Sequence, residues 1–95
     1  MPRVITQPTP NPNSLKFSID GHSFIESGML AFGAAREAEN DALGAALFAL
    51  DGVANVFVVP AFVTVTKHPA TSWDRLATAI ERILLDSAGT SEAGE

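Results

Sequence analysis

The sequence contains no cysteine. This absence excludes disulfide bonds, thiol nucleophiles, thiolate zinc sites and metal clusters held by cysteine. The fold therefore depends on its apolar core for stability. We predict that the chain holds no cofactor.

Long apolar runs and basic clusters are also lacking. No run approaches the ~20 apolar residues that span a bilayer, and residues 1–6 have neither a signal-peptide nor a transit-peptide pattern. Lysine and arginine number 6 against 11 acidic residues, for a net charge of −5. Nucleic-acid-binding domains need clustered cations for the phosphates. We predict a cytoplasmic protein with no membrane and no nucleic acid as a partner.

Residues that could carry chemistry are few. His22 and His68 are the two histidines, and they lie far apart, each near a turn. A metal site needs three or four ligands, and only Asp20 and Glu26 lie close to His22 in the sequence. No serine sits in a Gly-x-Ser-x-Gly motif, and no glycine-rich loop is present for phosphate. We predict that the chain is not an enzyme, with no catalytic, cofactor-binding or metal residue.

The composition is that of one small globular domain. Of the 95 residues 46% are hydrophobic, including six phenylalanines and one tryptophan. A chain of this length buries roughly 60–65% of its unfolded surface, which is enough for one core. The segment 87–95 is small, polar and acidic, typical of a disordered tail. We expect a folded domain over residues 1–86 followed by this tail.

The first half of the chain contains extended segments. Residues 4–5 form a candidate edge strand, and the prolines within 7–13 favour an extended backbone. Apolar and polar residues alternate over 15–19, which predicts a half-buried strand. Residues 22–25 are expected to return as a short strand. The alanine-rich segment 29–39 is either irregular or a first helical turn interrupted by glycine.

Two later segments have helical periodicity. The first starts at Asn40 or Asp41, either of which can cap the free amide groups. It ends before Gly52, which suits the left-handed position after a helix. The second covers residues 71–84, with a threonine or serine cap followed by an apolar stripe.

Residues 53–59 and 62–67 predict a β-hairpin, because both are rich in β-branched residues and a Pro-Ala pair separates them. A two-residue or four-residue loop places four valines on one face, whereas a three-residue loop shifts the pairing by one residue. The expected pairs are Val58 opposite Val63 and Val56 opposite Val65.

The order strand–strand–helix–strand–strand–helix predicts the fold class. Such a chain forms a two-layer α+β domain, in which an antiparallel four-stranded sheet carries two helices on one face. The valine face has the higher apolar content, and we expect it to pack under the helices.

The other face of this sheet is the candidate partner-binding surface. If the valines face the helices, Phe57 and Phe62 point outward together with Thr64. Lys16 lies between residues that face the helices, so it points to the same open side. Exposed aromatic residues beside a cation are typical of interaction hot spots. We predict partner binding by Lys16, Phe57, Phe62 and Thr64, unless the proline-rich segment or a shifted register covers the phenylalanines.

Residues 9–17 read Thr-Pro-Asn-Pro-Asn-Ser-Leu-Lys-Phe, and this string resembles the opening signature of the amino-terminal domain of Nfu/NifU-like iron–sulfur cluster scaffold proteins. The resemblance spans about residues 8–85. Further features follow in the order typical of that family: Glu26-Ser27-Gly28 with Phe32, the helix residues 43–48, Gly52-Val53, the hairpin residues 57–67 and Trp73.

The resemblance implies a function. Nfu proteins bind their cluster through a separate carboxy-terminal domain with a Cys-x-x-Cys motif, which has no counterpart in this sequence. What the resemblance implies here is a non-catalytic adaptor that supports iron–sulfur cluster assembly or delivery by binding a scaffold or client protein. A second hypothesis is an iron carrier, which requires His22 or His68 to converge with carboxylates.

Overall fold

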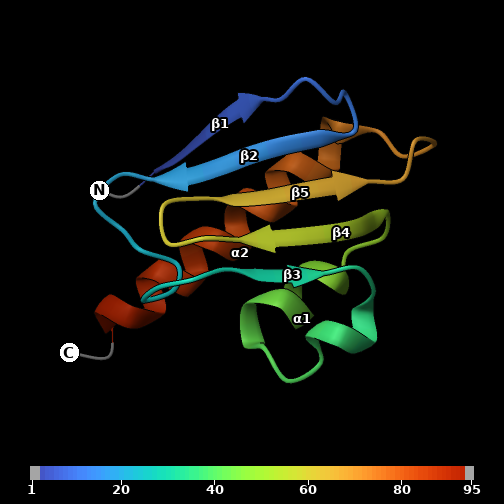
Figure 1. Cartoon of the computed structure of the whole chain (residues 1–95). Coiled ribbons are helices and arrows are strands. Elements are labelled where there is room, and N and C mark those ends of the chain that lie inside the picture. Colours follow the sequence, from blue (N-terminus) through green and yellow to red (C-terminus); the bar gives the residue numbers. More distant parts are fainter. Residues whose placement is uncertain (1–2, 94–95) are drawn as a thin grey trace.

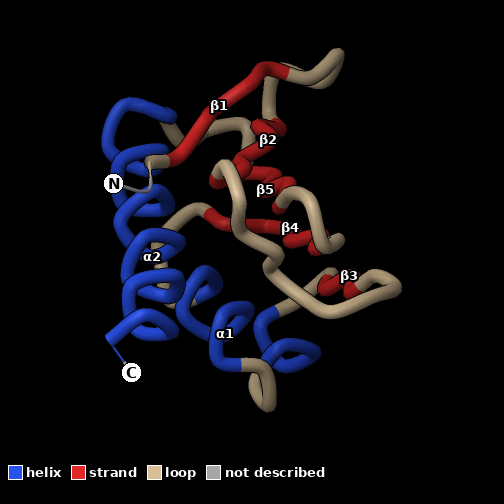
Figure 2. Tube along the Cα trace, turned by 90° about the vertical axis from the view of Figure 1, so that its left-hand side faces the viewer, coloured by secondary structure: helices blue, strands red, loops and turns tan. Residues whose placement is uncertain are grey.

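The computed structural model describes residues 3–93. These residues form two layers, an antiparallel sheet and a layer of two α-helices on one of its faces (Figures 1 and 2). The sheet has five strands in the order β1-β2-β5-β4-β3, so the expected class is confirmed but the expected four strands are corrected to five. The elements are β1 Val4–Pro8, β2 Ser14–Ile19, β3 Leu30–Phe32, α1 Ala42–Phe48, β4 Val53–Val58, β5 Val63–Lys67 and α2 Trp73–Ala93.

The segment 22–25 is not a strand, and that prediction was wrong. Strand β2 already pairs with β1 on one side and with β5 on the other, so no free edge remains for the residues that follow it. The segment instead runs past the β4–β5 hairpin, where the Phe24 amide donates to the Pro60 carbonyl at 2.9 Å. The additional strand is β3, which pairs with β4 at the far edge of the sheet.

The alanine-rich segment becomes β3 followed by a 3-10 helix over Ala35–Ala38. This short helix packs closely against α1. A Cβ atom on Gly44 would lie 2.9 Å from the Ala38 side chain and 3.0 Å from the Phe32 ring. Glycine at this position therefore allows α1 to approach the edge of the sheet.

Helix α1 begins and ends near the predicted residues. The Asp41 carboxylate accepts a hydrogen bond from the Gly44 amide at 2.7 Å and caps the helix. Gly52 adopts a positive φ of +99° as predicted, but the helix ends earlier, with Ala49 as its C-cap, so Gly52 lies in the turn that leads into β4 and not directly after the helix.

The hairpin register is the predicted one. Val58 pairs with Val63 and Val56 with Val65, across a four-residue loop in which the Val59 amide donates to the Phe62 carbonyl. All four valines are fully buried under the helices. The valine face is therefore the core face.

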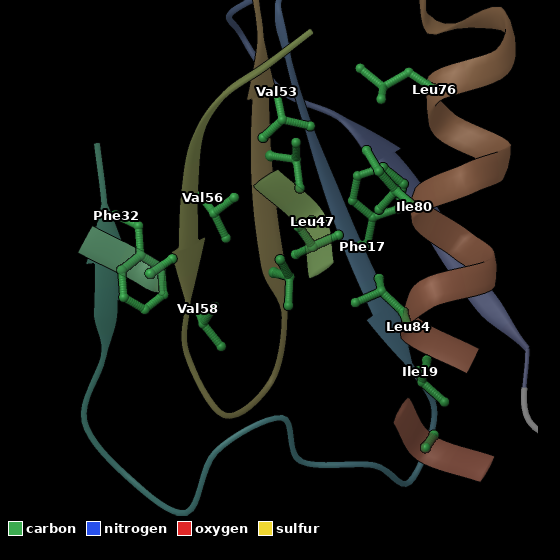
Figure 3. Packing of buried hydrophobic residues seen from close by; sticks show 14 residues of the cluster. Phe17, Ile19, Phe32, Leu47, Val53, Val56, Val58, Leu76, Ile80 and Leu84 are labelled. Atoms are coloured by element: carbon green, nitrogen blue, oxygen red, sulfur yellow. The ribbon is translucent and has the colours of Figure 1, made fainter. Parts of the chain in front are cut away.

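The core lies between this face and α2 (Figure 3). Phe17 from β2, Leu47 from α1 and both Ile80 and Leu84 from α2 are 0% exposed. Helix α2 continues to Ala93, so it passes the expected domain end at residue 86. Ala88 is 3% exposed and belongs to the core, and of the expected tail only residues 94–95 lie outside the described part.

Candidate functional site

Three of the four predicted partner-binding residues form a row across the middle of the sheet. Lys16 in β2 pairs with Thr64 in β5, and Thr64 pairs with Phe57 in β4. Paired residues on adjacent strands point to the same face. The row lies on the face opposite the helices, because each of its residues directly adjoins a buried core residue along its strand: Phe17, Val63 or Val56.

Phe62 joins this row from the hairpin loop. The Lys16 ammonium lies over the Phe62 ring, 4.4 Å from its centroid. A cation at this distance is attracted by the ring face, so the contact holds the lysine side chain across the sheet. The structure therefore brings all four predicted residues together, and we call them the open-face patch: Lys16, Phe57, Phe62 and Thr64.

The open-face patch is partly exposed. All four residues are half-buried, and both α-helices lie on the other side of the sheet (Figure 2). Neither alternative that would cover the phenylalanines is present among residues 3–93. The proline-rich segment forms part of β1 and the β1–β2 loop, and the hairpin register is not shifted.

The charge of this face differs from that of the chain. None of the five strands contains an aspartate or glutamate, although the sequence has 11 acidic residues. Lys16 is therefore the charged residue among the open-face strand positions, which otherwise carry hydroxyl, amide and apolar groups. The strand positions of this face therefore carry one cation and no carboxylate, and Asp20 lies at its border, directly after β2.

A shallow hollow of about 380 Å³ adjoins the patch. Ile5 and Ser18, which pair across β1 and β2, line it together with Ala61 from the hairpin loop. Ile5 is 42% exposed. The sequence analysis missed Ile5 as part of this surface. Successive residues of a strand point to opposite faces, so one of the two apolar residues of the expected edge strand had to lie on the open side.

The Pro-Asn-Pro-Asn string has a structural role that the sequence analysis did not identify. Lys67 is only 7% exposed, and its ammonium donates to the Asn13 side-chain oxygen at 3.0 Å. It also lies 5.8 Å from the centre of the Trp73 ring, and the Trp73 indole N–H donates to the Pro12 carbonyl at 3.1 Å. These contacts join the β1–β2 loop, the end of β5 and the start of α2. We call this group the Lys67 cluster: Pro12, Asn13, Lys67 and Trp73.

The histidines do not converge with carboxylates. His22 packs edge-to-face against Phe24 with 5.0 Å between the ring centres, and His68 is exposed after β5. Within residues 3–93, no three His, Cys, Asp or Glu side chains come together as a group able to hold a metal ion. The iron-carrier hypothesis therefore gains no ligand set from the described residues.

No helix within the described range 3–93 has both the length and the apolar character needed to cross a bilayer.

Comparison with known proteins gives consistent results. Residues 4–90 match the family described as "Scaffold protein Nfu/NifU N terminal". The chain is 44% identical over 83 residues to NifU-like protein 5, mitochondrial, of Arabidopsis thaliana, a match that covers 87% of this chain and 30% of the relative. It is 40% identical over 84 residues to the human mitochondrial NFU1 iron-sulfur cluster scaffold homolog, which covers 87% of this chain and 33% of that protein.

A solved structure of a NifU-like protein from Saccharomyces cerevisiae has the same fold. Its TM-score to this chain is 0.83 at 20% sequence identity, over 95% of this chain and 81% of the other. This chain spans about a third of the length of the two curated relatives above.

Proposed function

The chain belongs to the Nfu/NifU amino-terminal family, and from this membership we propose that it is a non-catalytic adaptor in iron–sulfur cluster assembly or delivery. It acts by binding a scaffold or client protein through the open-face patch. The family is described as scaffold proteins and the human relative is named as an iron–sulfur cluster scaffold homolog, and this chain matches about a third of that relative. The relatives are named as mitochondrial, and the cytoplasmic location of this chain stays a prediction.

One observation carries this proposal. The sheet has an aromatic and cationic surface that no described helix covers, with Lys16 placed over Phe62 and Phe57 two strands away. Aromatic residues are enriched in interfaces and among the residues that supply most of their binding free energy. Thr64, Thr66 and Ser18 add hydroxyl groups to the same face.

The geometry also favours binding over catalysis. The four residues of the open-face patch include no carboxylate, histidine or cysteine, which are among the side chains that most often serve in acid–base or covalent catalysis. The partner's own groups would carry the cluster, and this chain would supply a rigid docking surface.

Affinity capture tests the proposal. The immobilised chain is exposed to native lysate of its source cells in parallel with the double variant Phe57→Ala/Phe62→Ala and a control, Arg36→Ala, whose exposed arginine lies in the 3-10 helix. We expect wild type and control to retain proteins that carry or assemble iron–sulfur clusters, and the double variant to lose them. The proposal fails if the double variant captures the same proteins, or if none of the proteins that it loses belongs to that class.

A further inference from the structure

A second surface lies on the helix side of the molecule, between α2 and the turn that follows α1. Two adjoining hollows of about 460 and 220 Å³ run along this line, and they share Leu50, Arg75 and Ala79. Leu50 and Ile83 are apolar and only half-buried there. Together the hollows form a groove with apolar residues along its length.

Two arginines border this groove. Arg75 and Arg82 are seven residues apart on α2, which is close to two helical turns, so both lie on the same side of the helix. Thr78 and Ala79 between them have short side chains and leave the groove open. Both arginines are exposed, and neither guanidinium has a hydrogen bond or an ion pair with another described side chain of residues 3–88.

The arginines are concentrated here on an acidic chain. The sequence has six lysines and arginines in all, and two of them line one hollow. Asp74 lines the same hollow and Asp51 the smaller one, but neither forms an ion pair with the arginines. A guanidinium presents five donors in a planar fork and is well suited to bind a carboxylate through two of them.

We propose that this groove binds a short acidic amphipathic helix from a protein partner. Apolar side chains of that helix pack on Leu50, Ala79 and Ile83, and two of its carboxylates, about two turns apart, pair with Arg75 and Arg82. The α2 residues that line the larger hollow run from 74 to 83, about 14 Å along the helix axis. A partner helix of about ten residues matches this length, and it would extend the helical layer as a third helix.

This proposal goes beyond the adaptor function and does not depend on it. The groove is lined by α2 and the turn after α1, and the open-face patch lies on the face of the sheet opposite the helices. Figure 2 shows both helices on one side of the sheet. A chain with two separate docking surfaces can hold two partners at once, which would let it bring a donor and a recipient of a cluster together.

Peptide selection tests the groove without knowledge of the partner. A phage-displayed library of random 16-residue peptides is selected on the immobilised chain, and the recovered peptides are measured by fluorescence anisotropy. We expect enrichment of peptides with two acidic residues seven positions apart and apolar residues between them at helical spacing. Their affinity should fall by about tenfold or more in the variant Arg75→Glu/Arg82→Glu, and it should be unchanged in the control Arg36→Glu.

The groove proposal is wrong if no recovered peptide depends on the two arginines, or if the enriched peptides lack acidic residues. Circular dichroism checks that the double variant is folded, which we expect because both arginines are exposed. Peptides that depend on Phe57 and Phe62 instead would contradict the groove and support the open-face patch, so the two proposals fail separately.

Discussion

The two faces of the sheet are built from the same three central strands, yet they differ in burial and in the chemical character of their side chains. On the helix side, Phe17, Val56 and Val63 are completely buried. On the other side, Lys16, Phe57 and Thr64 directly adjoin these residues in sequence and are half-buried. A step of one residue along a strand thus exchanges the core for the surface. Stability and recognition are therefore assigned to alternate residues, and substitutions can separate them.

The largest expected effect is on the helix side. Phe17→Ala removes a completely buried ring and should lower the free energy of unfolding by about 3–5 kcal/mol. A small domain has only about 5–10 kcal/mol in total, so the thermal midpoint should fall by about 10 °C or more. Circular dichroism during heating measures it. Ile80→Ala, on the facing side of the core, should behave similarly, and unchanged midpoints in both variants would show that α2 does not pack on this face.

An intermediate effect is expected for Lys67→Ala, which we compare with Lys16→Ala. The two lysines lie on opposite faces of the sheet, and each is placed over an aromatic ring. Lys67→Ala deprives the Asn13 side-chain oxygen of its buried donor and should cost about 1–3 kcal/mol. Lys16→Ala should change the free energy of unfolding by no more than about 0.5 kcal/mol. Urea denaturation followed by circular dichroism compares them. Equal losses would contradict the distinction between the Lys67 cluster and the open-face patch.

Of the two phenylalanines on opposite faces of the sheet, Phe57 has the smaller expected effect on stability, and Phe57→Ala should cost about 1 kcal/mol. The ring is half-buried on the face without helices, and its removal leaves no enclosed cavity. The fluorescence of Trp73, the one tryptophan, reports unfolding in urea. The matched comparison is with Phe17→Ala, whose side chain lies on the opposite face of the same sheet. A loss as large as that of Phe17→Ala would place Phe57 in the core and remove the basis of the open-face patch.

Local patterns predicted the parts of the fold in which neighbours in sequence determine the structure. The alternating valines set the hairpin register, and the Asp41 cap and Gly52 turn mark the ends of the α1 region. The same alternation placed Lys16 and Thr64 on one face. These signals suffice because burial of one face selects a single register.

The remaining features depend on contacts between distant segments. Strand β3 has only three residues, too few for a recognisable alternation, and it is a strand because β4 offers a free edge. The Lys67 cluster joins residues 54 and 61 positions apart, and no local pattern reveals such pairs. Helix α2 continues beyond residue 86, and Ala88 is buried in the core. The small, polar residues of the segment after 86 do not predict this burial.

The strand order has a consequence for how the chain folds during synthesis. Strand β2 occupies an inner position, and its inner neighbour β5 lies far downstream, with Ser14 and Thr66 separated by 52 positions. A ribosome adding roughly 5–20 residues per second needs about 3–10 s to cover that distance. Throughout this interval the nascent β1–β2 hairpin has an unpaired edge, and a lone hairpin is only marginally stable in water. The emerging chain is therefore vulnerable to pairing with other strands until β5 has left the ribosome.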